Sequence, residues 1–442
     1  MKAFTFKGLF LTAVFILLGC LSIQAADDDL ITKQITIKLD KAGTLPDRIT
    51  SSKKYKITNL KIIGEINGTD FRMIREMAGS DYYGGSTEGN LSVLDLSEAK
   101  IVIGGGDCFN GYSCYTSNDV IGNRAFSGCS RLTSLTLPAS ITRIGDDAFC
   151  CCSGLTSLTL PAGITEIGYG AFWGCSGLTS LNLPAGITSI GDDAFYGCSG
   201  LTSITLPAGI TEIGGSAFNG CSRLTSLTLP AGITSIGGGA FYGCSGLTSL
   251  NLPAGITEIG GGAFGFCSGL TSINLPAGIT SIGEYAFYGC SGLTSVTLPA
   301  GITEIGECAF YGCSGLTSLT LPAGLTQIDD YAFSECSGLT SIYVYAEKVP
   351  KIGEDVFTGC DAKKCTVYVP KGTYDDYWLS DFRNYFENIV EFDATGIDKT
   401  TTSTDVEEVS RYSVNGQRLV GPTKGLNIVK YSDGSVKKVA VE

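Results

Sequence analysis

The 442-residue chain contains no histidine, and its 30 Lys and Arg against 43 Asp and Glu give a net charge of −13. Without histidine it lacks the commonest general base, the Ser-His and Cys-His nucleophile pairs and the commonest zinc ligand. Basic residues are scarce where the sequence is most regular: residues 124–346 hold four Arg, no Lys and thirteen Asp or Glu. Such a surface repels phosphate backbones. We therefore expect neither nucleic-acid binding nor enzyme activity, and no catalytic, cofactor-binding or metal-binding residues.

Long apolar runs are also missing after the first 25 residues, so no transmembrane helix is expected. Those first residues combine two lysines, an apolar stretch over 9–18 and small residues around position 25, which is typical of a secretory signal. Cleavage after Ala25 is one route. The other is cleavage before Cys20, in a Leu-Leu-Gly-Cys sequence similar to a lipoprotein box, which would leave a lipid anchor at Cys20.

A 23-residue repeat of the form LTSLTLPAGITEIGxxAFxGCSG dominates the chain. A fixed period of this length is typical of a solenoid, in which stacked coils complete a core that no coil has alone. With about 4.8 Å added by each coil, we expect one elongated body of roughly a dozen coils. Ten cysteines mark the period: Cys129, Cys152, Cys175, Cys198, Cys221, Cys244, Cys267, Cys290, Cys313 and Cys336.

Alternation within each unit predicts a short parallel strand. In one unit Leu135 and Leu137 point inward, Ser134 and Thr136 point outward, and Pro138 ends the strand. The isoleucines, the Ala-Phe pair and the cysteine of the unit fill the rest of the coil. The expected fold class is a repeat solenoid, mainly β, with short parallel strands in each coil, an N-terminal cap and a small C-terminal β-module.

The segments that flank the repeats are not repetitive. Strand-like runs over 34–39 and 55–64 and a helical pattern over 70–78 predict a cap for the first coil. Near the C-terminus, Asn-Gly and Asp-Gly pairs at 415–416 and 433–434 are strong hairpin signals. The expected organisation is a signal peptide over 1–25, a cap over 26–89, a leucine-rich-repeat solenoid with its closing segment over 90–392, a linker over 393–408 and a small β-module over 409–442.

The unit LxxLxLPxxIxxIGxxAFxxC resembles the BspA-type leucine-rich repeat of bacterial surface proteins, over about residues 90–392. The flanking sequences at 60–70 and 365–372 also resemble those beside such arrays. The resemblance implies a curved solenoid, secretion or display on the outer surface of a bacterium, and adhesion or host-protein binding. The tail from Tyr412 resembles the C-terminal sorting module of proteins exported by the type IX route; a β-module that merely ends the chain is the alternative.

Translation along a solenoid sets identical groups in parallel rows, which favours many weak equivalent contacts over catalysis. We expect binding to an extracellular host or matrix protein or to a glycan; the alternative is a structural spacer or lattice surface. One aromatic column varies after the Ala-Phe pair and either contacts the ligand or shields the coil corners. Its members are Trp173, Tyr196, Tyr242, Tyr288 and Tyr311.

The cysteine ladder admits two interpretations. Equivalent residues of adjacent coils lie at a separation that allows disulfides, but a repeated inward position is also where cysteine acts as a small hydrophobe. We favour reduced thiols packed in the core. The cysteines outside the ladder are better bridge candidates, and we expect Cys108 to pair with Cys114 and Cys360 with Cys365.

Overall fold

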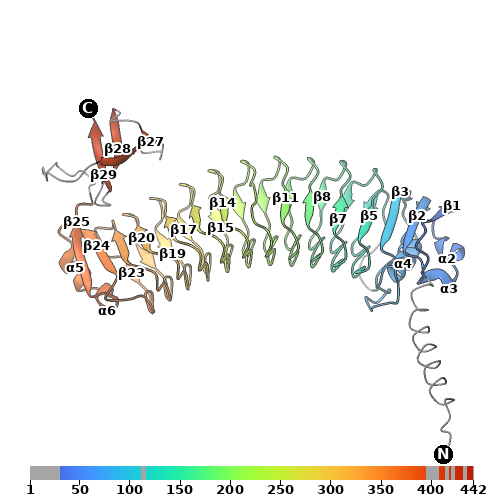
Figure 1. Ribbon diagram of the computed structural model, residues 1–442, viewed down its shortest axis with the longest axis horizontal. Coiled ribbons are helices and arrows are strands. Elements are labelled where there is room, and N and C mark those ends of the chain that lie inside the picture. The colour runs from blue at the N-terminus through green and yellow to red at the C-terminus, as the bar shows by residue number, and fades with distance from the viewer. Residues whose placement is uncertain are drawn as a thin grey trace, which may run out of the picture.

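The computed structural model is a parallel β-solenoid of about 15 coils with little helix. It describes residues 30–110, 116–394, 408–413, 418–419, 424–431 and 436–441. Figure 1 shows the coils stacked side by side along a gently curved rod, with short helices at each end of the array. The expected fold class is confirmed. There are more coils than the expected dozen because the flanking segments also contribute strands to the stack.

The first row of strands follows the predicted Ser-Leu-Thr pattern, and neighbouring strands pair in parallel with a register of one repeat, as Leu135 does with Leu158. Residues 226–228 form no strand, and the row is divided there into two sheets. The central residue is buried and its two neighbours are exposed in most of these strands, as in Ser134–Thr136. The strands of this row within the repeats are β5 (Ser134–Thr136), β7 (Ser157–Thr159), β9 (Ser180–Asn182), β11 (Ser203–Thr205), β14 (Ser249–Asn251), β16 (Ser272–Asn274), β18 (Ser295–Thr297), β20 (Ser318–Leu321) and β22 (Ser341–Val344).

A second row of two-residue strands follows the Pro-Ala-Gly turn in most coils. Its buried isoleucines, such as Ile144, form the opposite wall of the core. The row consists of β4 (Val120–Ile121), β6 (Arg143–Ile144), β8 (Glu166–Ile167), β10 (Ser189–Ile190), β12 (Glu212–Ile213), β13 (Ser235–Ile236), β15 (Glu258–Ile259), β17 (Ser281–Ile282), β19 (Glu304–Ile305), β21 (Gln327–Ile328) and β23 (Lys351–Ile352).

The core is built from columns of equivalent residues. The phenylalanine column runs from Phe126 to Phe357, with adjacent ring centroids 5.1–5.6 Å apart and ring planes within 3–10° of parallel. The ten ladder cysteines are buried free thiols, so the interpretation as packed thiols holds in this structure.

The thiols also donate hydrogen bonds between coils. Each ladder cysteine from Cys152 to Cys336 donates its Sγ–H to the phenylalanine carbonyl of the preceding coil, at 3.0–3.3 Å. A buried carbonyl therefore gains a partner that alanine or valine would not supply. The column links each coil to the next by polar as well as apolar contacts.

The N-terminal cap continues the first row of strands. Its strands β1 (Ile35–Leu39) and β2 (Asn59–Ile66) pair in parallel, and β2 pairs in parallel with β3 (Val93–Ile101), the strand of the first coil, which leads directly into β5. Three helices accompany them: α2 (Leu45–Arg48), α3 (Ser51–Lys54) and α4 (Gly68–Met77). A capping box of Asn67 and Asp70 starts α4. Phe71 of α4 packs edge-on against Phe126 at 5.4 Å and covers the end of the phenylalanine column.

The closing segment adds two strands, β24 (Thr366–Pro370) and β25 (Asn388–Phe392), joined by the short helices α5 (Tyr374–Trp378) and α6 (Phe382–Tyr385). After β24 the chain turns back through α5 and α6, and β25 pairs in parallel with β24 as the last strand of the stack. Phe386, directly after α6, packs against Phe357 at 5.0 Å and ends the phenylalanine column.

The C-terminal module is an antiparallel sheet with the order β27-β26-β28-β29. Its strands are β26 (Glu408–Ser413), β27 (Arg418–Leu419), β28 (Gly425–Tyr431) and β29 (Val436–Val441). Both expected turn dipeptides lie outside the described residues, as do the expected signal peptide and Cys20. Within the part of the chain that the structure describes, no helix combines the length and apolarity needed to cross a membrane.

The phenylalanine column makes the stability of the array sensitive to one ring. Phe218 is fully buried and stacks on both neighbours, so Phe218→Ala should lower the free energy of unfolding by about 3–5 kcal/mol. The loss should concentrate around that coil, because each coil contacts only its neighbours. Urea unfolding with hydrogen exchange measures both effects. Asn251→Thr, which introduces the residue found at the equivalent position 297, is the control and should change the free energy of unfolding by less than about 0.5 kcal/mol. Equal losses from the two variants would contradict the role of the phenylalanine column in stability.

The buried thiols make stability depend on pH. Burial raises the pKa of Cys198, Cys244 and Cys290 from 9.0 to about 12. Below pH 9 both states keep these protons, so the full free energy of unfolding is present. As the pH rises above 9 the unfolded chain loses them first, and the free energy of unfolding falls by about 1.4 kcal/mol per pH unit for each thiol.

Urea unfolding at about pH 8 and pH 10 tests this dependence. Replacing all three of these cysteines with alanine should flatten the decline relative to the parent, whatever the absolute stability of the variant. An unchanged slope would show that the thiols do not titrate on unfolding.

Candidate functional site

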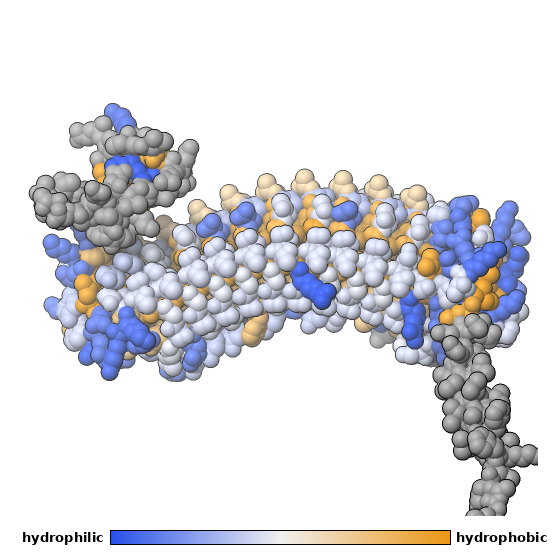
Figure 2. Space-filling model, viewed as in Figure 1, coloured by the Kyte–Doolittle hydropathy of each residue, from blue (hydrophilic) through white to orange (hydrophobic). Residues whose placement is uncertain are grey.

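Most of the array surface is uniform. The outward positions of the first strand row carry Ser, Thr and Asn, and Figure 2 shows a broad pale face over the coils, with strongly hydrophilic patches gathered mainly at the two ends. The sequence varies most at one corner of each coil, at the two positions before the Ala-Phe pair and the two after it. Contacts that distinguish one coil from another are therefore expected at these corners.

The predicted aromatic column lies at this corner, but it is divided into two groups. Trp173 and Tyr196 form one pair, with ring centroids 5.0 Å apart. Asn219 occupies the column in the next coil and separates that pair from the second group. There, Tyr288 and Tyr311 stack at 4.9 Å with planes 6° apart.

Two further aromatics, which the sequence analysis did not single out, complete the second group. Phe266 lies between Tyr242 and Tyr288, with its ring centroid 5.3 and 5.2 Å from theirs and its plane turned by 73° and 62°. Tyr285 lies 5.8 Å from Tyr288. These five residues, Tyr242, Phe266, Tyr285, Tyr288 and Tyr311, are called the aromatic strip below.

Phe266 occupies a position that is glycine in most coils. Its φ of +55° matches the left-handed backbone of Gly243 and Gly289 in the adjacent coils, a conformation that costs a non-glycine residue about 1–2 kcal/mol. The ring remains 44% exposed. A Cβ at Gly289 would lie 2.9 Å from it, so the neighbouring glycine makes room for the ring. Cys151 and Glu335 have the same conformation at the equivalent positions of other coils, so the left-handed backbone is set by the coil, and Phe266 differs in carrying an exposed ring there.

Carboxylates adjoin the strip. The Tyr285 hydroxyl donates to Glu307 Oε1 at 3.0 Å, and this hydrogen bond raises the pKa of Tyr285 to about 12. Glu284, the residue before Tyr285, is exposed. Further along the corner, the charge of Asp355 raises the pKa of Tyr331. The rings of the strip therefore lie in a negative environment.

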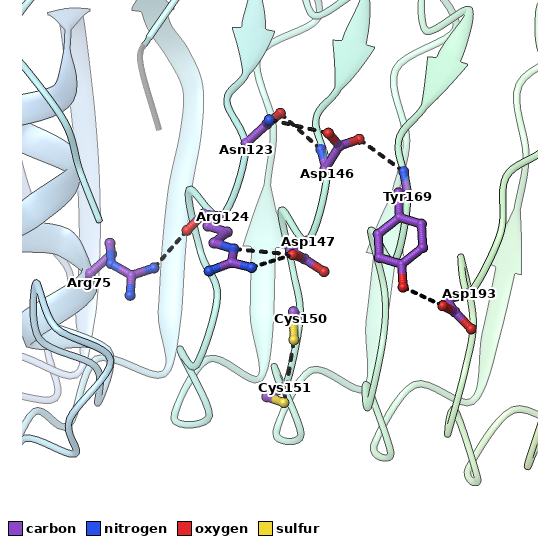
Figure 3. A network of polar contacts seen from close by, with 9 residues as sticks. All are labelled: Arg75, Asn123, Arg124, Asp146, Asp147, Cys150, Cys151, Tyr169 and Asp193. Carbon is purple, nitrogen blue, oxygen red and sulfur yellow. Dashed lines mark hydrogen bonds and ion pairs between the residues drawn. The ribbon is translucent and has the colours of Figure 1, made fainter. Parts of the chain in front are cut away.

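Not every acid at the corner is free to contact a ligand. Figure 3 shows that Asp146 accepts from the backbone N–H of Tyr169, and Asn123 accepts from that of Asp146. Asp192 accepts in the same way from Gly215, at 2.6 Å. These short side chains complete the backbone hydrogen bonding between coils. Glu307 occupies the position equivalent to Asp146 and Asp192. Its side chain is one methylene longer, and its carboxylate accepts a hydrogen bond from the Tyr285 hydroxyl instead of from a backbone N–H.

The polar network at the N-terminal end is structural. Buried Arg75 of α4 donates to the carbonyl of Arg124 at 2.7 Å, and Arg124 pairs with Asp147 of the next coil at 3.0 Å (Figure 3). Tyr169 donates to Asp193 at 2.5 Å, one coil further. The network ties the cap to the first coils, and its acids already have cation or hydroxyl partners.

The two predicted bridges have different outcomes. Cys108 is disulfide-bonded, but Cys114 lies outside the described residues, so their pairing stays a prediction. The expected bridge between Cys360 and Cys365 is not formed, since both are free thiols. Cys360 keeps the ladder position of the last coil, and its Sγ points to the carbonyls of Phe333 and Cys336 at 3.6 and 3.5 Å. No cluster of three or more Cys, Asp or Glu among the described residues could hold a metal ion.

Residues 108–222, 165–277 and 257–377 match the family model described as the BspA type leucine-rich repeat region. The chain belongs to this family. A leucine-rich repeat protein from Bacteroides ovatus is 25% identical with a TM-score of 0.53, over 81% of this chain and 92% of that chain.

Two other solved structures are similar over parts of the array. A leucine-rich cell surface protein from Faecalibacterium prausnitzii is 26% identical with a TM-score of 0.37, over 72% of this chain and 91% of that chain. A leucine-rich repeat protein of T. pallidum is 30% identical with a TM-score of 0.34, over 42% of this chain and 78% of that chain. No curated protein is significantly similar in sequence.

A stability measurement tests whether Phe266 is available for ligand contact or is needed to pack the solenoid. Phe266→Gly restores the residue found in most coils of this BspA-type array, so the relief of strain should offset the lost ring contacts. We expect the free energy of unfolding to stay within about 1 kcal/mol of the parent. Phe264→Ala, two residues away in the buried column, should cost about 3–5 kcal/mol. Similar losses from both changes in urea unfolding would make Phe266 a packing residue.

Proposed function

We propose that this BspA-type leucine-rich repeat protein is a secreted or surface-displayed binding protein that attaches to extracellular proteins or glycans through its solenoid. The aromatic strip carries this proposal. It places five rings on four adjacent coils, and two of them, Phe266 and Tyr285, are exposed on a left-handed backbone. Exposed aromatic side chains supply large, rigid contact surfaces and are enriched among the residues that dominate binding energy.

The geometry suits an extended partner. Neighbouring rings of the strip lie 4.9–5.8 Å apart, so one ligand segment that lies along the rod would meet several rings in succession. Each contact can be weak, because contacts made by one tethered partner add through a raised effective concentration. The same translation leaves few places where unlike groups converge, and with no histidine in the chain a binding role is favoured over catalysis.

The proposal places the mature chain outside the cytoplasm. It is supported by the signal-like features of residues 1–25 and by the bacterial surface proteins that share this repeat. The antiparallel sheet β26–β29 would then serve as the sorting module for export, with lipid attachment at Cys20 as the other way of holding the protein at the outer surface.

Binding assays against immobilised matrix proteins and a glycan array test the proposed function. The variant Phe266→Gly with Tyr288→Asn should lose at least about tenfold in affinity for any ligand that the parent binds. Both new residues occur at the equivalent positions of other coils, so the fold should be kept. The matched control is Tyr196→Asn, the same change outside the strip, which should bind like the parent.

If the strip variant binds the ligand as tightly as the parent does, the aromatic strip is not the binding site. If the parent binds nothing on either panel, the adhesion proposal fails and a spacer role becomes the better explanation of the array.

A further inference from the structure

We propose that the partner presents a cationic segment, rich in Arg or Lys, to the aromatic strip. This inference rests on the proposed binding function and adds the chemical class of the ligand. It comes from the juxtaposition of five ring systems with carboxylates on a part of the array that has no positive charge of its own.

The charge of the second half of the array favours a cationic partner. Residues 224–347 contain no Lys, Arg or His and eight Asp or Glu, so this half of the array has a negative field that no side chain within it offsets. The earlier coils differ, because Arg143 pairs with Glu166 at 3.0 Å and Arg124 pairs with Asp147. Within the part of the chain that the structure describes, Glu284 and Glu307 have no ion-pair partner. A cationic partner would supply the missing charge, and its approach would be steered by the field.

The geometry of the strip favours the same class of partner. Glu307 is hydrogen-bonded to Tyr285, whose ring lies 5.8 Å from that of Tyr288. A carboxylate and two rings are therefore held within one small area. A guanidinium that lies over a ring can direct its N–H groups to an adjacent carboxylate, which combines a cation–π contact with a charge-assisted hydrogen bond.

Rings elsewhere in this chain already contact such cations. In the closing segment, Arg383 lies over Trp378 with its Cζ 4.3 Å from the ring centroid. In the cap, Arg75 lies over Phe109 at 4.7 Å. The aromatic strip contains the same kind of ring but lies in the stretch without a basic residue, so a cation over these rings would have to come from another molecule. Arginine should serve better than lysine, because its planar group stacks on rings and forms forked hydrogen bonds.

The experiment uses the full chain and four fluorescent probes of similar length: an arginine-rich peptide, a lysine-rich peptide, a serine-rich peptide and a neutral glucose oligosaccharide. The arginine-rich peptide should bind, and its affinity should fall by about tenfold or more between about 50 and 300 mM NaCl. A lysine-rich peptide should bind more weakly. The other two probes should bind at least about tenfold more weakly than the arginine-rich peptide.

Two sets of variants locate the site. Glu284→Gln with Glu307→Gln, and separately Phe266→Gly with Tyr288→Asn, should each reduce binding of the arginine-rich peptide by about tenfold. The control pair, Glu212→Gln with Tyr196→Asn, makes the same kinds of change outside the strip and should leave binding unchanged.

If the glutamate variants lose binding but the ring variants do not, the peptide is held by charge alone and the assignment to the strip is overturned. If only the neutral oligosaccharide binds, and does so through the strip, the cationic class is wrong while the proposed binding function stands. If the parent binds none of these probes but binds a matrix protein through the strip without salt dependence, the cationic class again fails on its own.

Discussion

The whole array depends on one contact that repeats between coils, where a phenylalanine ring and a cysteine thiol of one coil meet the phenylalanine of the coil before. The rings stack at 5.1–5.6 Å and the thiol donates to the carbonyl at 3.0–3.3 Å. Because a single coil has no closed core, both contacts form only when the coils are in register. One extra residue between Phe333 and Phe357 already lengthens the contact of Cys360 with the Phe333 carbonyl to 3.6 Å.

Periodicity made most of this fold predictable. A period of 23 residues places equivalent side chains in one column, so the buried Leu, Ile, Phe and Cys positions followed directly from the repeat. The donor role of the thiols did not, because it depends on where a carbonyl of another coil lies. The expected Cys360–Cys365 bridge failed for a related reason: closeness in sequence does not show that Cys360 keeps its place in the ladder.

The candidate site was predictable only in part. Column counting found Tyr242, Tyr288 and Tyr311, since they share one position of the repeat. It missed Phe266, which occupies the next position, where most coils have glycine. Only the folded arrangement shows that the Phe266 ring lies between those of Tyr242 and Tyr288, in the coil where Gly265 supplies no ring. The shared repeat position also placed Trp173 in one column with the strip, although Asn219 separates Trp173 from the strip in the structure. A residue that breaks the repeat was the usable signal for Phe266.

The location of the strip follows from the constraints on each part of a coil. The outward strand residues lie in a parallel ladder, and the core columns accept only side chains that can stack on their equivalents. The residue types at both kinds of position are therefore nearly the same in every coil. The corner is constrained less, and there a short aspartate such as Asp192 still completes the backbone ladder. Replacing it with glutamate, as at position 307, frees the carboxylate from the backbone and brings it to an aromatic hydroxyl. A single methylene thus separates an acid that holds the solenoid together from an acid that can contact a partner.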